Sequence, residues 1–125
     1  MYPKELLNPI LQILLLSCLS RKNRMYGYEM IRELKNAYGR KIDPNDGWVN
    51  TQLKKLETEG FATSEVVTVA GMKRRYFSMT PAGTGFYKER LEELSSFLVL
   101  TGTFLAITQP APPLNYTEEY QVCLN

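Results

Sequence analysis

The segment from Phe61 to Met79 limits the fold most, because its residue pattern differs from that of the rest of the chain. β-Branched residues crowd its first half, Ala70-Gly71 suits a tight turn, and successive side chains alternate in character from Arg74 onwards. β-Branched residues with a period of two favour strands, and a turn between two such runs is typical of a hairpin. The sequence therefore predicts one β-hairpin with a basic return strand.

Residues 4–20 predict a first helix, because apolar residues recur there at intervals of three and four. Ile13 and Leu16 add a second apolar side. A helix that is apolar on two sides must be buried on both, so we expect one side in the chain's own core and the other against a second subunit. The main stripe consists of Leu7, Ile10, Leu11, Leu14 and Cys18.

Two shorter helices are predicted next. The second helix spans residues 26–38, and the third begins in a stretch of turn-forming residues at 43–47. Gly39 stands where a helix C-cap belongs. Asn45 or Asp46 can cap the start of the third helix, which should run to Glu59 and end at Gly60. Its buried stripe is narrow and consists of Val49, Leu53 and Leu56.

A final helix is predicted from Thr80-Pro81, which match an N-cap and the first helical position. Apolar positions then alternate in spacing between four and three, which is a heptad seam and indicates a partner helix. The seam residues are Tyr87, Leu91, Leu94, Leu98, Thr101 and Leu105. Prolines from residue 110 end the pattern, so residues 108–125 are expected to form a flexible tail.

This order of elements predicts a mainly α fold with a small β-hairpin wing, the winged helix-turn-helix layout. The winged helix-turn-helix domain is expected at residues 1–79 and a C-terminal dimerisation helix at residues 80–107.

Composition argues against catalysis. The chain has no histidine, which removes the commonest general base and metal ligand, and its two cysteines form no CxxC pair. We therefore expect no enzyme activity, no catalytic residue, no metal site and no cofactor. Cysteines that stay reduced suit a cytoplasmic protein.

An exported or membrane-attached protein is the weakest hypothesis. Residues 15–18, Leu-Leu-Ser-Cys, loosely resemble a lipoprotein cleavage site, but Asn8, Pro9 and Gln12 interrupt the apolar run that an export signal needs. The later apolar stretch, residues 97–107, is short beside the about 20 residues that span a bilayer.

The net charge of only +2 does not indicate a nucleic-acid partner, but the positions of the charged residues do. The outer face of the third helix carries Thr51, Lys54 and Lys55, with Asn50 at its flank, and the hairpin carries Lys73, Arg74 and Arg75 beside its turn. A polar helix can read base edges, and a basic wing can lie against phosphates. Either feature alone also suits a solvated surface, and a charged wing also discourages sheet aggregation; together they favour double-stranded DNA.

Four motifs resemble the PadR family of transcriptional regulators, over roughly residues 6–98. They are residues 25–30 (Met-Tyr-Gly-Tyr-Glu-Met), 44–47, 53–60 (Leu-Lys-Lys-Leu-Glu-Thr-Glu-Gly) and 71–83, the basic wing that runs into Thr-Pro-Ala-Gly. The resemblance implies a winged-helix dimer in which the C-terminal helix packs on the partner's N-terminal helix. It also implies repression that is relieved by a small molecule such as a phenolic acid or a drug.

The third predicted helix, which corresponds to the DNA-recognition helix of the family, departs from the family pattern. Where the family has Gly-Ser-Leu-Tyr-Pro, this chain has Gly47-Trp48-Val49-Asn50-Thr51, so Asn50 replaces a tyrosine. Asparagine can still read adenine, but the altered surface leaves the operator sequence open.

Two hypotheses therefore stand side by side. The first is a homodimeric, sequence-specific repressor. Its dimer interface would combine Leu7, Ile10 and Leu14 with the tyrosine and leucines of the seam, and an apolar effector pocket would be lined by Trp48, Phe97 and Phe104. The second is a protein-interaction module without specific DNA binding, in which Trp48 and the apolar C-terminal helix form the partner surface.

Overall fold

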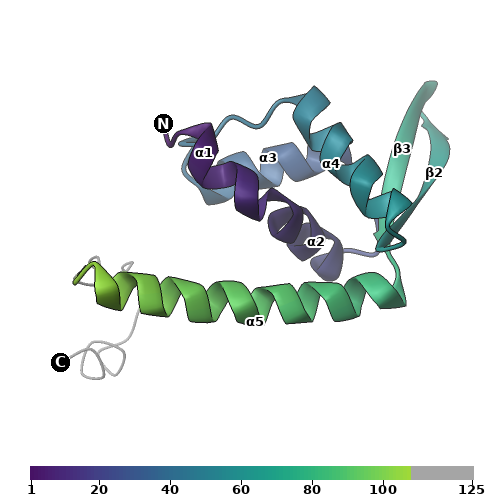
Figure 1. Cartoon of the computed structure of the whole chain (residues 1–125). Helices are drawn as coiled ribbons and strands as arrows, with labels where there is room; N and C mark the ends of the chain where they lie inside the picture. The colour runs from purple at the N-terminus through teal and green to yellow at the C-terminus, as the bar shows by residue number, and fades with distance from the viewer. Residues whose placement is uncertain (108–125) are drawn as a thin grey trace, which may run out of the picture. The chain divides into compact units, whose positions relative to one another are not determined.

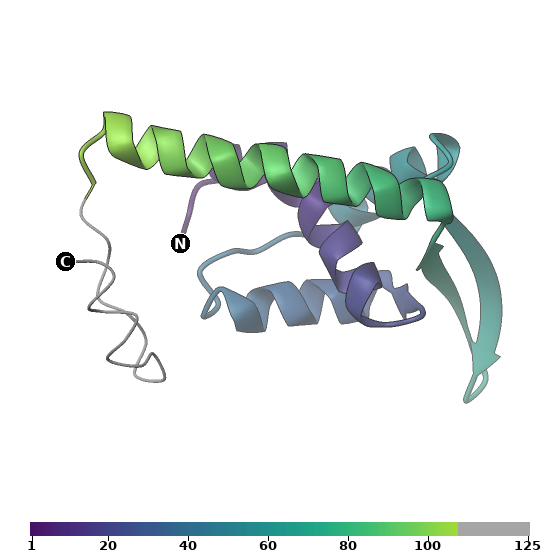
Figure 2. The same ribbon diagram turned by 90° about the horizontal axis from the view of Figure 1, so that it is seen from below.

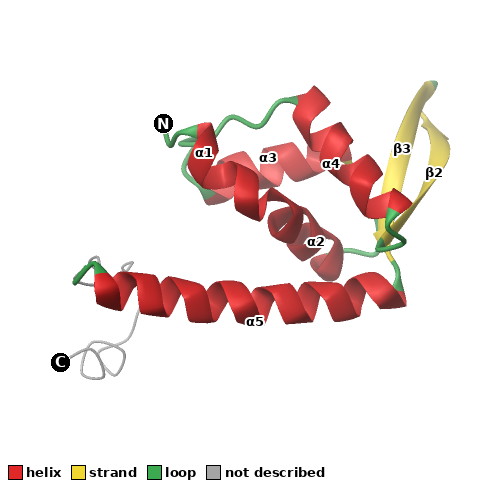
Figure 3. Ribbon diagram, in the orientation of Figure 1, coloured by secondary structure: helices red, strands yellow, loops and turns green. Residues whose placement is uncertain are grey.

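The computed structural model describes residues 1–107, which form helices and one three-stranded antiparallel sheet with the strand order β1-β3-β2 (Figures 1 and 3). The predicted tail, residues 108–125, lies outside the described residues. The elements are α1 (Lys4–Leu7), the 3-10 helix η1 (Asn8–Ile10), α2 (Leu11–Arg21), β1 (Met25–Tyr26), α3 (Gly27–Ala37), α4 (Asp46–Thr58), β2 (Ala62–Val69), β3 (Met72–Met79) and α5 (Pro81–Phe104). The predicted fold class, mainly helical with a hairpin wing, is confirmed.

Contacts divide the chain into two units, Met1–Leu91 and a second one that begins at Glu92. The first unit holds every helix and strand up to β3 and the first turns of α5. Within this unit Phe86 stacks on Phe61, with ring centroids 4.1 Å apart, and so ties the start of α5 to the segment before β2. The sequence-based boundary after residue 79 divides the chain by expected role, DNA binding before it and dimerisation after it. This assignment of roles stays a prediction.

The single helix predicted for residues 4–20 is wrong in one respect, because η1 separates α1 from α2. Pro9 lies in η1 and has no backbone N–H to donate, and its ring disfavours a regular α-helix in the preceding turn. The apolar side chains still reach the core: Leu11, Leu15 and Leu16 are fully buried.

Helix α4 begins as predicted. The side-chain oxygen of Asn45 accepts a hydrogen bond of 2.8 Å from the backbone N–H of Trp48, so Asn45 rather than Asp46 is the N-cap. The predicted stripe of Val49, Leu53 and Leu56 is completely buried. Helix α4 therefore keeps its opposite face for solvent or a partner.

Strands β2 and β3 form the predicted hairpin, in which Val66 pairs with Arg75 and Ser64 with Phe77. Its turn uses Ala70 and Gly71, both with positive φ. Figure 2 shows this two-stranded ribbon extending away from the start of α5. A third strand, β1, was not predicted, because two residues give too little pattern; it pairs Met25 with Phe77 and so fixes the base of the wing to the helices.

Thr80 joins the wing to α5. Its hydroxyl donates a hydrogen bond of 2.7 Å to the carbonyl of Gly60 and accepts one of 3.0 Å from the N–H of Gly83. Thr80 is thus the N-cap that the sequence predicts, and it also fastens the end of β3 to the end of α4.

The described part of the second unit is the C-terminal half of α5 and the three residues after it. It exposes large apolar side chains in succession: Phe97, Leu98, Val99, Leu100, Phe104, Leu105 and Ile107. Over residues 1–107, no helix combines the length and the hydrophobicity that crossing a bilayer requires.

Candidate nucleic-acid interface

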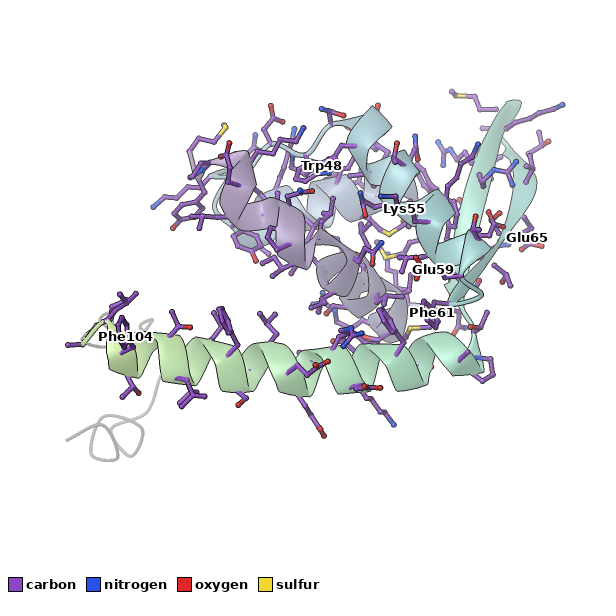
Figure 4. The ribbon with its side chains drawn as sticks, in the orientation of Figure 1. Trp48, Lys55, Glu59, Phe61, Glu65 and Phe104 are labelled. Carbon is purple, nitrogen blue, oxygen red and sulfur yellow. The ribbon has the colours of Figure 1, made fainter. Side chains whose placement is uncertain are left out.

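The outer face of α4 carries all four side chains predicted for base and phosphate contact, Asn50, Thr51, Lys54 and Lys55, and all are exposed. A shallow hollow of about 310 Å³ runs along this face and is lined by Thr51, Lys54, Lys55, Thr58 and Glu59. Figure 4 shows Lys55 on this helix and Glu59, its C-cap residue. Within residues 1–107 neither lysine has an ion-pair partner, so both ammonium groups are available to phosphates.

Asn50 lies where α3 and α4 meet. A Cβ atom built on Gly27, the first residue of α3, would be 3.1 Å from the side-chain oxygen of Asn50 and 3.9 Å from Leu53. The lack of a side chain at Gly27 therefore lets α3 and α4 approach each other closely. The approach places the start of α3 beside the Asn50 amide.

The three basic residues of the wing do not share one face. Side chains alternate along a strand, so Arg74 points to the face opposite that of Lys73 and Arg75. The guanidinium of Arg74 lies over the ring of Tyr26, 4.7 Å from its centroid. An arginine that stacks on an aromatic ring is held by a cation–π contact, so Arg74 is braced against β1.

A second stacked arginine, Arg24, lies on the same face of the sheet as Arg74. Its guanidinium lies 4.6 Å from the ring centroid of Tyr76 and makes an ion pair of 2.8 Å with Glu65, and Tyr76 packs edge-on against Tyr26 at 5.3 Å. The sequence analysis missed this group, because Arg24 belongs to a polar stretch that separates two helices. Its only signal was the basic run that precedes β1.

Arg75 is tied to α4 through β2. One of its terminal nitrogens donates to the hydroxyl of Ser64 at 3.0 Å, and that hydroxyl donates to the carboxylate of Glu57 at 2.6 Å. The sequence analysis also missed Ser64 and Glu57, since only the tertiary structure brings them to Arg75.

The residues predicted for a dimer interface differ in exposure. Leu7 is 5% exposed and belongs to the core of its own chain, whereas Ile10, Leu14 and Tyr87 are partly buried against that core. In α5, Leu94 is partly buried. The others are 43% to 58% exposed: Leu91, Leu98 and Leu105.

Trp48, predicted to line an effector pocket, contacts the N-terminal helices. Its indole N–H donates to the Asn8 side chain at 3.2 Å, and the Lys4 ammonium lies 4.6 Å from the centroid of its ring. Phe97 and Phe104 belong to the second unit and are 63% and 88% exposed. A pocket that combines Trp48 with these two rings would draw on both units, and it stays a prediction.

The buried thiol of Cys18 is not a reactive centre. Burial, reinforced by the nearby charge of Glu33, raises the pKa of Cys18 to about 11, so the unreactive thiol form dominates at neutral pH. Within residues 1–107 no three metal-ligating side chains lie close enough to bind an ion.

Comparison with known proteins agrees with this geometry. The sequence profile of the transcriptional regulator PadR-like family matches residues 15–89, which run from the middle of α2 to the first turns of α5. A comparison with curated protein sequences finds no match.

Several solved structures share the fold. A transcriptional regulator from Clostridium thermocellum is similar with a TM-score of 0.74 and 20% identity, over 83% of this chain and 98% of that one. A PadR family transcriptional regulator from Eggerthella lenta gives 0.72 and 23%, over 82% and 88%. Bacillus subtilis PadR in complex with operator DNA gives 0.58 and 20%, over 91% of this chain and 57% of that one. The family match covers more than half of the sequence, and the chain belongs to the PadR-like family of transcriptional regulators.

Proposed function

We propose that this protein is a sequence-specific, double-stranded-DNA-binding transcriptional repressor that acts as a homodimer in the cytoplasm. One observation carries the proposal: the first unit presents an exposed polar face on α4 together with the basic residues of the wing. In helix-turn-helix proteins the second helix of the motif enters the major groove, and a neighbouring basic ribbon adds contacts to the backbone.

A relative supports the same role. Bacillus subtilis PadR, which shares the fold, has been solved with operator DNA. In this chain the corresponding work falls to Asn50, Thr51, Lys54 and Lys55 on α4 and to Lys73, Arg74 and Arg75 on the wing. Asn50 would read an adenine, since its amide offers a donor and an acceptor side by side.

Dimerisation is proposed from α5. The exposed apolar side chains of its C-terminal half would be costly in water and need a partner surface, which a second copy supplies. Two recognition helices related by a two-fold axis would enter successive major grooves, about 34 Å apart. A small apolar or phenolic effector that releases the operator, lodged near Trp48, Phe97 and Phe104, completes the proposal.

The test is selection from a pool of random duplexes, followed by titration of the enriched duplex and of the gene's own upstream region at two salt concentrations. We expect a palindrome to be enriched. Changing Asn50→Ala should lower affinity for that palindrome only, whereas Lys54→Ala should also reduce the salt slope by about 0.9 if the lysine meets a phosphate.

The matched control is Lys88→Ala, which removes the same charge from an exposed position on α5. Its affinity and salt slope should equal those of the unmodified protein. Weak binding that is uniform over all sequences and disappears with salt would overturn the proposal and favour the protein-interaction module.

A further inference from the structure

A chain of two hydrogen bonds links three elements of the proposed DNA surface. Glu57 stands on α4, Ser64 on β2 and Arg75 on β3. The Ser64 hydroxyl donates its proton to the Glu57 carboxylate at 2.6 Å and accepts from an Arg75 terminal nitrogen at 3.0 Å. A hydroxyl has one proton and free lone pairs, so both bonds form at once without competing.

The register of the hairpin places this chain of bonds on the α4 side of the sheet. Ser64 pairs with Phe77, whose side chain is 3% exposed and belongs to the core. Arg75 lies two residues from Phe77 and so shares its face, while the neighbouring Arg74 stacks on Tyr26 on the other face. Of these two adjacent arginines, only Arg75 is coupled to the recognition helix.

Arg75 keeps most of its donors while it is coupled. A guanidinium carries five N–H groups, and the bond to Ser64 uses one. The remaining groups can make paired hydrogen bonds to a phosphate, for which the planar guanidinium is well shaped. The coupling and a phosphate contact are therefore compatible in one arginine.

We propose that Ser64 and Glu57 are positioning residues for DNA recognition: they hold Arg75 at a fixed place relative to α4, so that the wing meets its phosphate when the recognition helix is in register with the bases. This inference rests on the proposed function. Without the two bonds, Arg75 samples several rotamers, and the wing contact no longer favours one register of α4. Ser64 then contributes to sequence selectivity without touching a base.

The experiment compares Ser64→Ala with Thr63→Ala on the enriched palindrome and on a scrambled duplex of equal length. Ser64→Ala removes both bonds and changes no charge. Thr63→Ala also removes a hydroxyl from β2, at an exposed position on the opposite face. Thermal unfolding of each variant shows whether the hairpin is intact.

We expect Ser64→Ala to weaken palindrome binding roughly five-fold, the size of one hydrogen bond, with scrambled-duplex binding unchanged. Thr63→Ala should match the unmodified protein, and Ser64→Thr, which keeps a hydroxyl, should restore part of the loss. In the background of Arg75→Gln, Ser64→Ala should have no further effect, because its action passes through Arg75.

A purely structural role would give another pattern. Equal losses on both duplexes, or a loss in Ser64→Ala that persists undiminished beside Arg75→Gln, would overturn the positioning role while leaving the proposed function intact. If the unmodified protein enriches no palindrome, both the proposed function and the positioning role fail.

Discussion

Gly83 stands where no side chain fits. A Cβ atom there would overlap the carbonyl oxygen of Phe61 and lie 2.9 Å from Met79 Cγ, and Gly83 is buried at the start of α5. The backbone of Phe61 cannot yield easily, because its carbonyl also accepts a hydrogen bond from the N–H of Thr80 at 3.2 Å. The Thr-Pro-Ala-Gly motif is thus a packing junction: threonine caps α5, and glycine lets the helix approach the end of α4.

Gly83→Ala should therefore destabilise the first unit by about 3 kcal/mol, the upper range for overpacking in a core. Gly85→Ala is the matched control, since a Cβ atom there would meet nothing within 4 Å. In a helix, alanine is favoured over glycine by up to about 1 kcal/mol, so Gly85→Ala should be neutral or stabilising. Urea unfolding followed by circular dichroism measures both. Equal stability of the two variants would contradict the packing junction.

At the scale of one element, the N-cap of α4 connects stability with the proposed reading of DNA. The Asn45 side chain satisfies the N–H of Trp48 and so fixes the first turn, and Asn50 and Thr51 follow in the second turn. Asn45→Ala should cost about 1 kcal/mol of unfolding free energy. It should also weaken palindrome binding, because Asn50 directly follows the first turn and loses support when that turn frays.

Asn45→Ser is the control for this effect, since serine also caps helices well and should preserve both properties. Hydrogen exchange at the amide of Trp48 gives the local readout, and protection should fall in Asn45→Ala alone. If protection stays unchanged while binding falls, Asn45 itself contacts DNA and the capping explanation is wrong.

The sequence predicted those elements whose pattern is long and local. Periodicity, turn residues and β-branched residues predicted α3, α4 and the hairpin. Cap chemistry predicted the start of α5 at Thr80 and narrowed the cap of α4 to Asn45 or Asp46, of which the structure uses Asn45. It missed β1, because its two residues gain strand geometry only by pairing with Phe77 and Tyr76 on β3. It missed the break at η1, because the apolar spacing continues across Pro9.

The proposed site follows the same division. Exposed cations and amides on α4 can be read from a helical pattern, whereas the partners that orient the wing arginines cannot. Arg74 and Arg75 are neighbours in the sequence, yet one stacks on Tyr26 and the other binds Ser64. The difference arises because strand pairing brings Tyr26 and Ser64, which are distant in the sequence, next to the two arginines, and a local sequence pattern does not contain this information.

At the scale of the whole molecule, the main question is what covers the apolar side chains of α5. Leu98 is 58% exposed in the single chain and occupies a heptad seam position with Leu91 and Leu94. If this seam is the dimer interface, a charge at Leu98 has to be desolvated on association, which costs several kcal/mol and should leave the protein monomeric.

Leu98→Lys should therefore shift the mass measured by sedimentation from dimer to monomer, while unfolding of the first unit is unaffected. Ser96→Lys places the same charge on the same helix at an exposed position away from the seam, and it should remain dimeric. Because two recognition helices bind one palindrome, the monomer should lose much more affinity for the palindrome than the loss of any single contact on α4 would cause.

A Leu98→Lys variant that still sediments as a dimer would show that a different surface joins the subunits. A monomeric unmodified protein that still binds the palindrome would contradict the dimer model of recognition and leave the apolar side chains of α5 to another partner.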